Sequence, residues 1–414
     1  MNDGYSPARR PRPYPTRSTP LPEVDRSGWR KPWVHLKYYS FHPQIFPSMI
    51  RDVSADARPG SLVQVYDKED KPFGVGLWNP RSRVPLRMFH HGPDQVGEEQ
   101  FEGLIDRALD LRLNLMRPGE NTDAYRVVHS DGDGLSGLIV DRFADVLSVQ
   151  VHSLGIWQRL PSLLARLHAR LGTKRIVVDV DPEVARNEGI RPGEIQSDDV
   201  RTVKIRENGL RYEVDFTSGH KTGFFCDQRD NRQKLTHWVQ GRRMLDLCSY
   251  TGGFSISARV NGGAAEVTAV DLDEKAILQA KRNANLNNAK INWVHCDAYS
   301  FARQMRKDGK KFDVVLLDPP KLVFSREDEM EGMRRYEDLN ILGISITEPG
   351  GLLVTCSCSG LLGADEFERM VIRAGHKIDR KLQILDRTGA GLDHPVLSNC
   401  PEGRYLKLIW ARVW

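Results

Sequence analysis

The chain has 414 residues, which is long enough for two or three domains that each bury a core of their own. It contains no run of about eighteen apolar residues, so we expect no membrane-spanning helix. Its first residues form no apolar leader, so we expect no secretory signal. Six cysteines, none of them in a C-x-x-C pair, are too few for a disulfide framework, and a reduced, cytoplasmic location is expected.

Most of the net charge of +5 lies at one end of the chain. Residues 1–31 carry seven basic and three acidic side chains and so account for +4 of it. The remainder is nearly neutral, and bulk charge does not by itself indicate a nucleic-acid-binding protein. Because residues 1–30 are rich in Pro and Arg, we predict a disordered basic arm. Such an arm either strengthens contact with phosphates or is a solvated extension.

Short strands interrupted by proline follow from residue 32. The segments 61–67 and 72–78 are rich in β-forming residues and flank the polar turn K-E-D-K, which predicts a hairpin. With the alternating segment W-V-H-L-K-Y-Y, they predict a small β-barrel over residues 31–103. Residues 98–115 have the apolar spacing of a helix.

A compact α+β domain is predicted over residues 104–210. Asp131 and Asp133 lie in its glycine-rich turn, D-G-D-G-L-S-G. The later positions of this segment are apolar, so a turn is predicted rather than a calcium loop. Strands are expected at 125–129, 138–141, 146–151 and 175–180, and a helix at 154–171.

Strands and helices alternate over residues 211–414. This pattern predicts an α/β domain with a mostly parallel sheet covered on both faces, closed by an antiparallel hairpin at one edge. The expected strands are 244–247, 266–271, 292–296, 312–317, 351–356, 381–385 and 405–412, and the expected helices are 254–261, 274–287, 298–307, 330–347 and 364–375.

Acidic residues stand at the ends of three successive strands of this domain. Asp246 precedes a loop in which Gly252 and Gly253 lead into a helix, an arrangement with which such sheets hold nucleotide-like ligands. Asp271 and Asp297 end the next two strands, where carboxylates can accept hydrogen bonds from a ribose and an adenine amine. Asp271 could instead cap the following helix. Three such acids predict a nucleoside-containing cofactor.

The loop after the first strand indicates which cofactor this is. It lacks the G-x-G-x-x-G pattern, whose bare amides cradle a pyrophosphate. Instead it carries Cys248 and Tyr250, whose side chains crowd that approach. A cofactor without phosphates, S-adenosylmethionine (SAM), is therefore favoured over a dinucleotide such as NAD.

Two further segments bring reactive side chains to the same edge of the sheet. D-P-P-K places Asp318 and Lys321 after the fourth strand, in a rigid turn that suits close approach of a flat ring. V-T-C-S-C-S-G ends the fifth strand. We expect one of Cys356 and Cys358 to face the core as a small hydrophobe and the other to be a candidate nucleophile. No Cys or His pair at ligand spacing accompanies them, and no metal site is predicted.

Six motifs carry a resemblance to a known family. They are D-G-L-S-G-L-I-V-D-R-F (residues 133–143), G-H-K-T-G-F-F-C-D-Q-R-D-N-R (219–232), C-S-Y-T-G-G-F, D-P-P-K, S-C-S-G and D-H-P-V…P-E-G-R-Y-L-K (393–407). In this order they resemble the bacterial RlmI-type enzymes, SAM-dependent methyltransferases that modify a cytosine of large-subunit rRNA at carbon 5. The resemblance runs from residue 32 to the C-terminus. It implies a PUA-type RNA-binding barrel, an α+β linker domain and a class I, Rossmann-like methyltransferase domain.

The resemblance also implies roles for single residues. Cys358 takes the place of the nucleophile, and Cys356 is then its inward-facing partner. SAM contacts are implied for Gln228 and Arg229, for the loop from Cys248 to Gly253, for Asp271 at the ribose and for Asp297 at the adenine, and the expected site also includes Asp246 and Asp318.

The chemistry that the resemblance implies gives a catalytic role to each of the reactive side chains. Carbon 5 of cytosine is a poor nucleophile until a thiolate adds to carbon 6. We expect Cys358 to make that bond, Asp318 to hydrogen-bond the ring edge and Lys321 to help the thiol ionise. The target base must be unpaired or flipped out. The base that removes the carbon-5 proton is left open between Asp318, Lys321 and water.

Two other functions are kept open. D-P-P is similar to the N-P-P-Y turn of amine methyltransferases, so the target could be an exocyclic amine or a guanine nitrogen without a covalent intermediate. Alternatively, the chain could be an RNA-binding ribosome assembly factor with an inactive methyltransferase fold. Large-subunit rRNA is the expected partner, no membrane partner is expected, and a homodimer is left open.

Overall fold

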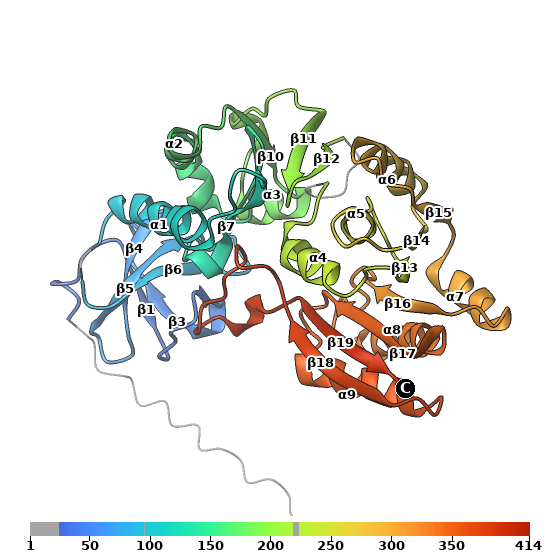
Figure 1. Ribbon diagram of the computed structural model, residues 1–414. Helices are drawn as coiled ribbons and strands as arrows, with labels where there is room; N and C mark the ends of the chain where they lie inside the picture. Colours follow the sequence, from blue (N-terminus) through green and yellow to red (C-terminus); the bar gives the residue numbers. More distant parts are fainter. Residues whose placement is uncertain (1–24, 95, 218–222) are drawn as a thin grey trace, which may run out of the picture.

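The computed structural model of the protein describes residues 25–94, 96–217 and 223–414. Figure 1 shows a first β-domain in blue, an α+β domain in blue-green to green and a C-terminal domain in yellow to red. The first domain has the strands β1 (Trp33–Leu36), β2 (Gln44–Ile45), β3 (Ile50–Val53), β4 (Leu62–Tyr66), β5 (Pro72–Trp78) and β6 (Leu86–His91). They form one sheet in the order β2-β6-β5-β4-β1-β3. β4 and β5 pair antiparallel, which confirms the predicted hairpin.

The end of the predicted disordered arm packs against this sheet. The Trp29 ring stacks on Tyr66, with the ring centroids 3.9 Å apart. The Arg30 amide donates a hydrogen bond to the Tyr66 hydroxyl (2.8 Å). The prediction of disorder is therefore wrong for residues 26–30. It rested on the average composition of the arm, which does not reveal that the single ring of Trp29 packs against the sheet. Residues 1–24 lie outside the described part of the chain.

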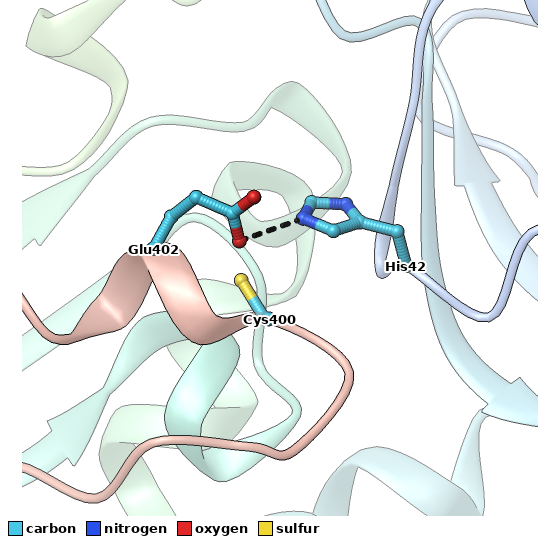
Figure 2. Close-up of side chains that lie close together, drawn as sticks. All are labelled: His42, Cys400 and Glu402. Carbon is cyan, nitrogen blue, oxygen red and sulfur yellow. Dashed lines mark hydrogen bonds and ion pairs between the residues drawn. The ribbon is translucent and has the colours of Figure 1, made fainter. Parts of the chain in front are cut away.

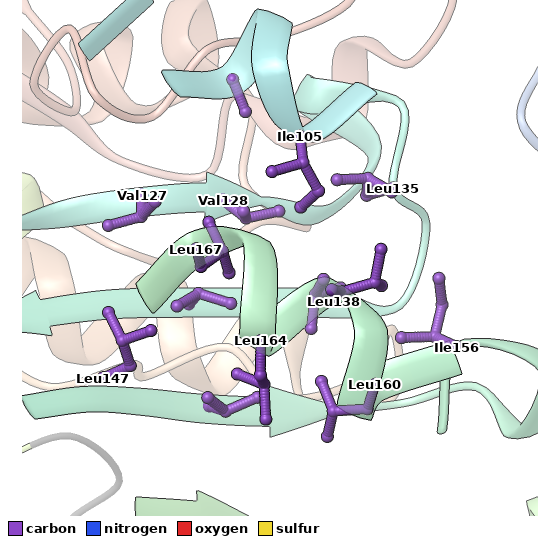
Figure 3. Packing of buried hydrophobic residues seen from close by; sticks show 14 of the residues in the cluster. Ile105, Val127, Val128, Leu135, Leu138, Leu147, Ile156, Leu160, Leu164 and Leu167 are labelled. Carbon is purple, nitrogen blue, oxygen red and sulfur yellow. The ribbon is translucent and has the colours of Figure 1, made fainter. Parts of the chain in front are cut away.

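The second domain packs two long helices against a four-stranded sheet. Its elements are α1 (Glu99–Asp110), the π-helical turn η2 (Leu111–Met116), β7 (Ala124–His129), β8 (Leu138–Phe143), β9 (Val146–Val151), α2 (Leu154–Leu171), β10 (Arg175–Asp179) and α3 (Pro182–Glu188). The strand order is β10-β9-β8-β7. Side chains such as Ile105 of α1, Leu138 of β8 and Leu164 of α2 fill the core (Figure 3). The boundary predicted at residue 103 falls inside α1, whose buried residues all pack in this second core.

The glycine-rich turn of this domain is held by a buried ion pair. Arg112 donates to both carboxylate oxygens of Asp133 (2.6 and 2.8 Å), and the His129 amide donates to the same group (2.6 Å). With its oxygens bonded in this way, Asp133 fixes the turn, as predicted against a calcium loop.

A hairpin joins the second domain to the third. It consists of β11 (Thr202–Glu207) and β12 (Leu210–Asp215), which pair antiparallel. Its buried Ile205 and Tyr212 share one cluster with Phe143 of the second domain and Ile256 of the third. The predicted boundary at residue 210 cuts this hairpin.

The third domain is a seven-stranded sheet with helices on both faces (Figure 1). Its strands are β13 (Arg243–Leu247), β14 (Glu266–Asp271), β15 (Asn292–His295), β16 (Phe312–Leu317), β17 (Thr347–Ser357), β18 (Leu382–Thr388) and β19 (Lys407–Val413). Their order is β15-β14-β13-β16-β17-β19-β18, with the first five parallel, which confirms the predicted mostly parallel sheet. β19 is antiparallel to both β17 and β18. The closing pair is therefore antiparallel as predicted, but a long connection rather than a tight hairpin links its strands.

The helices of the third domain agree with the sequence pattern, with one addition. They are α4 (Arg229–Thr236), α5 (Gly253–Val260), α6 (Glu274–Leu286), α7 (Ala298–Lys307), α8 (Glu329–Ser345) and α9 (Ala364–His376). α4 was not predicted, because its sequence, R-D-N-R-Q-K-L-T, offers almost no apolar periodicity. Among the described helices, none has the length and apolar character needed to cross a membrane.

Candidate active site

The acidic residues predicted at strand ends lie along one edge of the third sheet. β13 is the parallel neighbour of both β14 and β16, with Leu247 in register with Val270 and with Leu317. Asp271 ends β14 and Asp318 follows β16, on either side of the loop after β13. In open α/β sheets, ligands bind at the carboxyl ends of the strands, where the strand order reverses.

The loop after β13 has a strained backbone. Cys248 and Tyr250 have left-handed φ angles of 68° and 46°, and Gly252 has a φ of 86°. Non-glycine residues in this region cost about 1 to 3 kcal/mol each, and such strain clusters at ligand sites. A Cβ at position 252 would lie 2.6 Å from the ring of Trp293, so this turn requires glycine.

Asp246 is buried near the end of β13. The Ser255 hydroxyl donates to its Oδ2 (2.6 Å), whereas its Oδ1 is buried without a hydrogen-bond partner in the described residues. Burial raises the pKa of Asp246 to about 7, and the nearby charge of Asp271 adds to this effect. An unpaired buried carboxylate oxygen is costly, and a donor group of a ligand would remove that cost.

Asp271 and Asp297 accept backbone hydrogen bonds at the same edge. Asp271 accepts from the amides of Tyr250 (2.7 Å) and Asp273 (2.9 Å), and so fixes the loop after β13. The residue that caps α6 is Asp273, which shows that the capping alternative for Asp271 is wrong. Asp297 caps α7 by accepting from the Ser300 amide (2.8 Å).

Asp318 follows β16 at the same edge of the sheet, and its side chain contacts Gln228. Gln228 Nε2 donates to Asp318 Oδ1 (3.1 Å), and Asn231 holds Gln228 by donating to its Oε1 (2.8 Å). Burial, followed by the charges of Asp227 and Asp246, raises the pKa of Asp318 to about 7. The carboxyl group is therefore partly protonated near neutral pH and can donate as well as accept a hydrogen bond.

The two cysteines at the end of β17 have different environments. Cys356 is fully buried in the core, whereas Cys358 is partly exposed. One cysteine is thus in the core and the other is accessible, as expected, but strand alternation is not the reason. Residues two apart on a strand share a face, and both cysteines pack against the same hydrophobic cluster; Cys358 is partly exposed because β17 ends at Ser357. Burial, followed by the charges of Asp318 and Asp227, raises the pKa of the Cys358 thiol to about 11. The thiol therefore needs a cation to ionise.

Lys407 is a buried cation whose charge acts on this thiol. It begins β19 directly across from Ser357, is only 7% exposed, and donates from Nζ to the carbonyls of Ser359 (2.5 Å) and Tyr405 (3.0 Å). Its charge lowers the pKa of Cys358. Burial lowers the pKa of Lys407 itself to about 8.

Lys321 is exposed, and its ammonium group lies over the ring of Phe324 at 5.8 Å. The ionising role predicted for Lys321 stays a prediction, and Lys407 is a further candidate for it. Lys407 is brought to the end of β17 by sheet pairing, which the D-P-P-K motif does not indicate.

Arg229 is used in a structural ion pair. Its Nη1 and Nη2 donate to the two carboxylate oxygens of Asp393 (2.8 and 3.2 Å), and both side chains are buried. The Arg126 amide of β7 also donates to Asp393 (2.8 Å). Asp393 therefore joins the C-terminal segment to Arg229 of α4 and to the second domain through Arg126. The predicted contact of Arg229 with the cofactor stays a prediction.

These features fit the adenosyl cofactor predicted from the sequence. The strained loop, the carboxylate at the end of β14 and the unpaired oxygen of Asp246 converge where a nucleoside with a cationic group would bind. Such a ligand would pair its donors with carboxylates that otherwise cost free energy in the interior.

Comparison with known proteins agrees with this architecture. Residues 31–91 match the PUA-like domain family, and residues 191–385 match the S-adenosylmethionine-dependent methyltransferase family. A ribosomal RNA large subunit methyltransferase I from Erwinia tasmaniensis is 34% identical over 379 residues, which cover 90% of this chain and 95% of the relative. The protein of the same name from Alteromonas mediterranea is 34% identical over 88% of this chain and 93% of its own.

The chain belongs to the ribosomal RNA large subunit methyltransferase I family. Its cofactor is SAM. Among solved structures, SMU.776, assigned as a methyltransferase and solved in complex with SAH, has a TM-score of 0.73 and 22% identity, and the match covers 86% of this chain and 92% of that one. This similarity confirms the fold: a PUA-like domain followed by a class I methyltransferase domain.

Sequence reasoning missed two residues of this family member's site. Lys407 stands at the start of the apolar strand K-L-I-W-A-R-V, and a lysine there was a signal that could have been followed. Asp227 accepts from the Tyr405 hydroxyl (2.7 Å), and its Oδ1 is buried without a partner in the described residues. Its charge raises the pKa of both Asp318 and Cys358.

Proposed function

We propose that this chain transfers a methyl group from SAM to carbon 5 of a cytosine in large-subunit rRNA through a covalent adduct with Cys358. The observation that carries the proposal is the placement of a partly exposed thiol just after β17, the neighbour of β16, where the charge of Asp318 acts on it. The names of the family members supply the substrate class.

The proposed reaction uses the Cys358 thiolate as a temporary nucleophile. The thiolate adds to carbon 6 of the ring while N3 gains a proton, which makes carbon 5 nucleophilic. When bound, SAM supplies an electrophilic methyl group. The methyl transfer to carbon 5 would leave SAH. A base then takes the carbon-5 proton and the bond between Cys358 and carbon 6 breaks, which returns the thiolate, while N3 gives back the proton that it had gained.

Asp318 would supply the proton that N3 needs. Its raised pKa of about 7 keeps a usable fraction of the acid form at neutral pH, and an acid is most effective when its pKa lies near the working pH. The hydrogen bond from Gln228 Nε2 to Oδ1 fixes the orientation of the Asp318 carboxyl group.

Lys407 would stabilise the Cys358 thiolate. The two carbonyls that accept from Nζ hold the ammonium group near the end of β17, in surroundings where a charge acts strongly. We assign Lys407 as a positioning and charge-balancing residue that acts through Cys358. The cofactor would be held by the loop from Cys248 to Gly252, by Asp246 and by Asp271.

The test compares the full-length protein with two single-cysteine variants on deproteinised large-subunit rRNA and labelled SAM. Cys358→Ala should abolish transfer, whereas Cys356→Ala, two residues away, should retain it. RNA containing 5-fluorocytidine should trap a denaturant-resistant adduct with the wild type and with Cys356→Ala only, and nuclease digestion should release 5-methylcytidine.

Transfer by Cys358→Ala at the wild-type rate would overturn the covalent route and favour methylation of an amine or a guanine nitrogen. An absence of incorporation by the wild type into free rRNA and into assembling subunits would favour the assembly-factor alternative. SAH binding by each variant shows that its fold is intact.

A further inference from the structure

A histidine of the first domain lies against the C-terminal segment. His42 lies between β1 and β2, Cys400 precedes the 3-10 helix η6 (Pro401–Gly403), and Glu402 belongs to that helix. Figure 2 shows the three side chains turned toward one another. His42 Nε2, Cys400 Sγ and a Glu402 carboxylate oxygen all lie within 4.8 Å of one another. The Asn399 side chain also donates to the Phe41 carbonyl (2.5 Å), so the two segments already touch.

The three groups are the donor types that zinc takes in proteins. Bond lengths of about 2.0 Å to nitrogen and oxygen and about 2.3 Å to sulfur place tetrahedral ligands about 3.3 to 3.6 Å apart. His42 Nε2 and Glu402 Oε2 are 3.3 Å apart, which matches such a pair. Cys400 Sγ lies within 4.8 Å of the other two ligand atoms. A movement of about 1 Å would therefore bring the sulfur to the spacing of tetrahedral ligands.

The far side of the imidazole is also arranged as in a metal site. His42 Nδ1 lies 3.2 Å from the Gln44 carbonyl oxygen, which can accept its proton and leave the Nε2 lone pair free. Metal-bound histidines almost always donate their other N–H in this way. The backbone N–H of Gln44 lies 3.0 Å from the same Nδ1 and can donate to it instead. Which ring nitrogen of His42 carries the proton therefore depends on the group that binds Nε2.

A second carboxylate lies next to the segment that carries His42. Asp131 accepts from the Gln44 side chain through Oδ2 (2.9 Å), while its Oδ1 is buried without a partner in the described residues. A buried carboxylate oxygen without a partner is costly, and a nearby divalent cation would reduce that cost.

We propose that His42, Cys400 and Glu402 bind a zinc-type divalent cation that fastens the PUA-like domain to the C-terminal segment. Two ligands come from one short turn and the third from a residue about 360 positions away. The ion would therefore fix the orientation of the RNA-binding domain relative to the methyltransferase domain. This inference does not depend on which atom of the RNA is methylated.

The test is a titration of the full-length protein, freed of metal by a chelator, with Co²⁺ in the absence of oxygen. We expect one equivalent to give a thiolate-to-cobalt band and tetrahedral visible bands, both removed by Zn²⁺. Cys400→Ser should lose the thiolate band, and His42→Gln should weaken binding by roughly tenfold or more. Cys296→Ser is the matched control, a partly exposed cysteine outside the group, and should bind as the wild type does.

A second readout keeps the inference open to refutation if a variant binds poorly for structural reasons. Zn²⁺ should raise the melting temperature of the wild type and of Cys296→Ser, but not that of His42→Gln, whose circular dichroism shows whether it is folded. Absence of a saturable cobalt band, or a band that survives Cys400→Ser, would overturn the proposal and leave His42 and Glu402 as an ordinary ion pair.

Discussion

Asp246→Asn should change the pH dependence of stability in the methyltransferase domain. Because burial raises its pKa, the folded protein keeps a proton on this carboxyl up to about pH 7, whereas the unfolded chain releases it near the ordinary pKa of 3.8. Between these two values the unfolded state binds fewer protons, so the stability of the wild type falls as pH rises. Asparagine is neutral throughout and keeps an oxygen to accept from Ser255.

The expected magnitude follows from the two pKa values. A difference between 3.8 and about 7 corresponds to about 4 kcal/mol of free energy that the wild type loses between pH 4 and pH 8. The asparagine amide adds a packing or hydrogen-bond cost of about 1 to 3 kcal/mol, but this cost does not depend on pH. The difference in unfolding free energy between variant and wild type should therefore shift by about 4 kcal/mol in favour of the variant from pH 4 to pH 8.

The measurement is urea unfolding without cofactor at pH 4, 6 and 8, followed by hydrogen–deuterium exchange of peptides from β13 and β14. Local exchange is needed because a chain with three domains need not unfold in one step. Asp308→Asn is the control, since Asp308 is exposed at the end of α7 and should give no such trend. A difference between Asp246→Asn and wild type that stays constant with pH would refute the reasoning.

Three further predictions concern the charges around the site. Lys407→Met should raise the pKa of the Cys358 thiol above about 11, whereas Lys407→Arg should not. The pH dependence of the alkylation rate of Cys358 measures this pKa, and identical profiles for the two variants would contradict the assignment. Arg229→Met should lower the unfolding free energy by about 3 kcal/mol, because it leaves Asp393 buried without its ion pair. Thermal or urea unfolding measures this loss, and a loss below about 1 kcal/mol would show that the pair contributes little. Methyl transfer (kcat/KM) should rise tenfold per pH unit up to about pH 7 as thiolate forms, and then level off as Asp318 loses its proton, whereas Asp318→Asn should keep rising from a lower rate. A wild-type profile without a break near pH 7 would remove Asp318 as the acid.

The sequence pattern predicted the methyltransferase domain well because its signals are local. Parallel strands buried on both faces read as short apolar runs, and the helices between them carry a period of 3.6. The acids at Asp246, Asp271 and Asp318 fall at strand ends, so the strand assignment already placed them at one edge. The twofold period of a strand would place Cys356 and Cys358 on the same face, and they differ in exposure because β17 ends at Ser357. Domain boundaries were less well defined, because α1 and the β11–β12 hairpin pack across them.

The contacts that tune the site were decided only by the tertiary structure. β19 inserts between β17 and β18, and this pairing alone sets Lys407 across from Ser357 and beside the Cys358 thiol. The return of the C-terminal segment to the first and second domains brings Asp393 to Arg229 and Cys400 to His42. No local periodicity encodes such pairs, because their geometry depends on how separate domains pack. Sequence alone therefore determined the framework and the order of the chemical groups, whereas packing determined which charges meet.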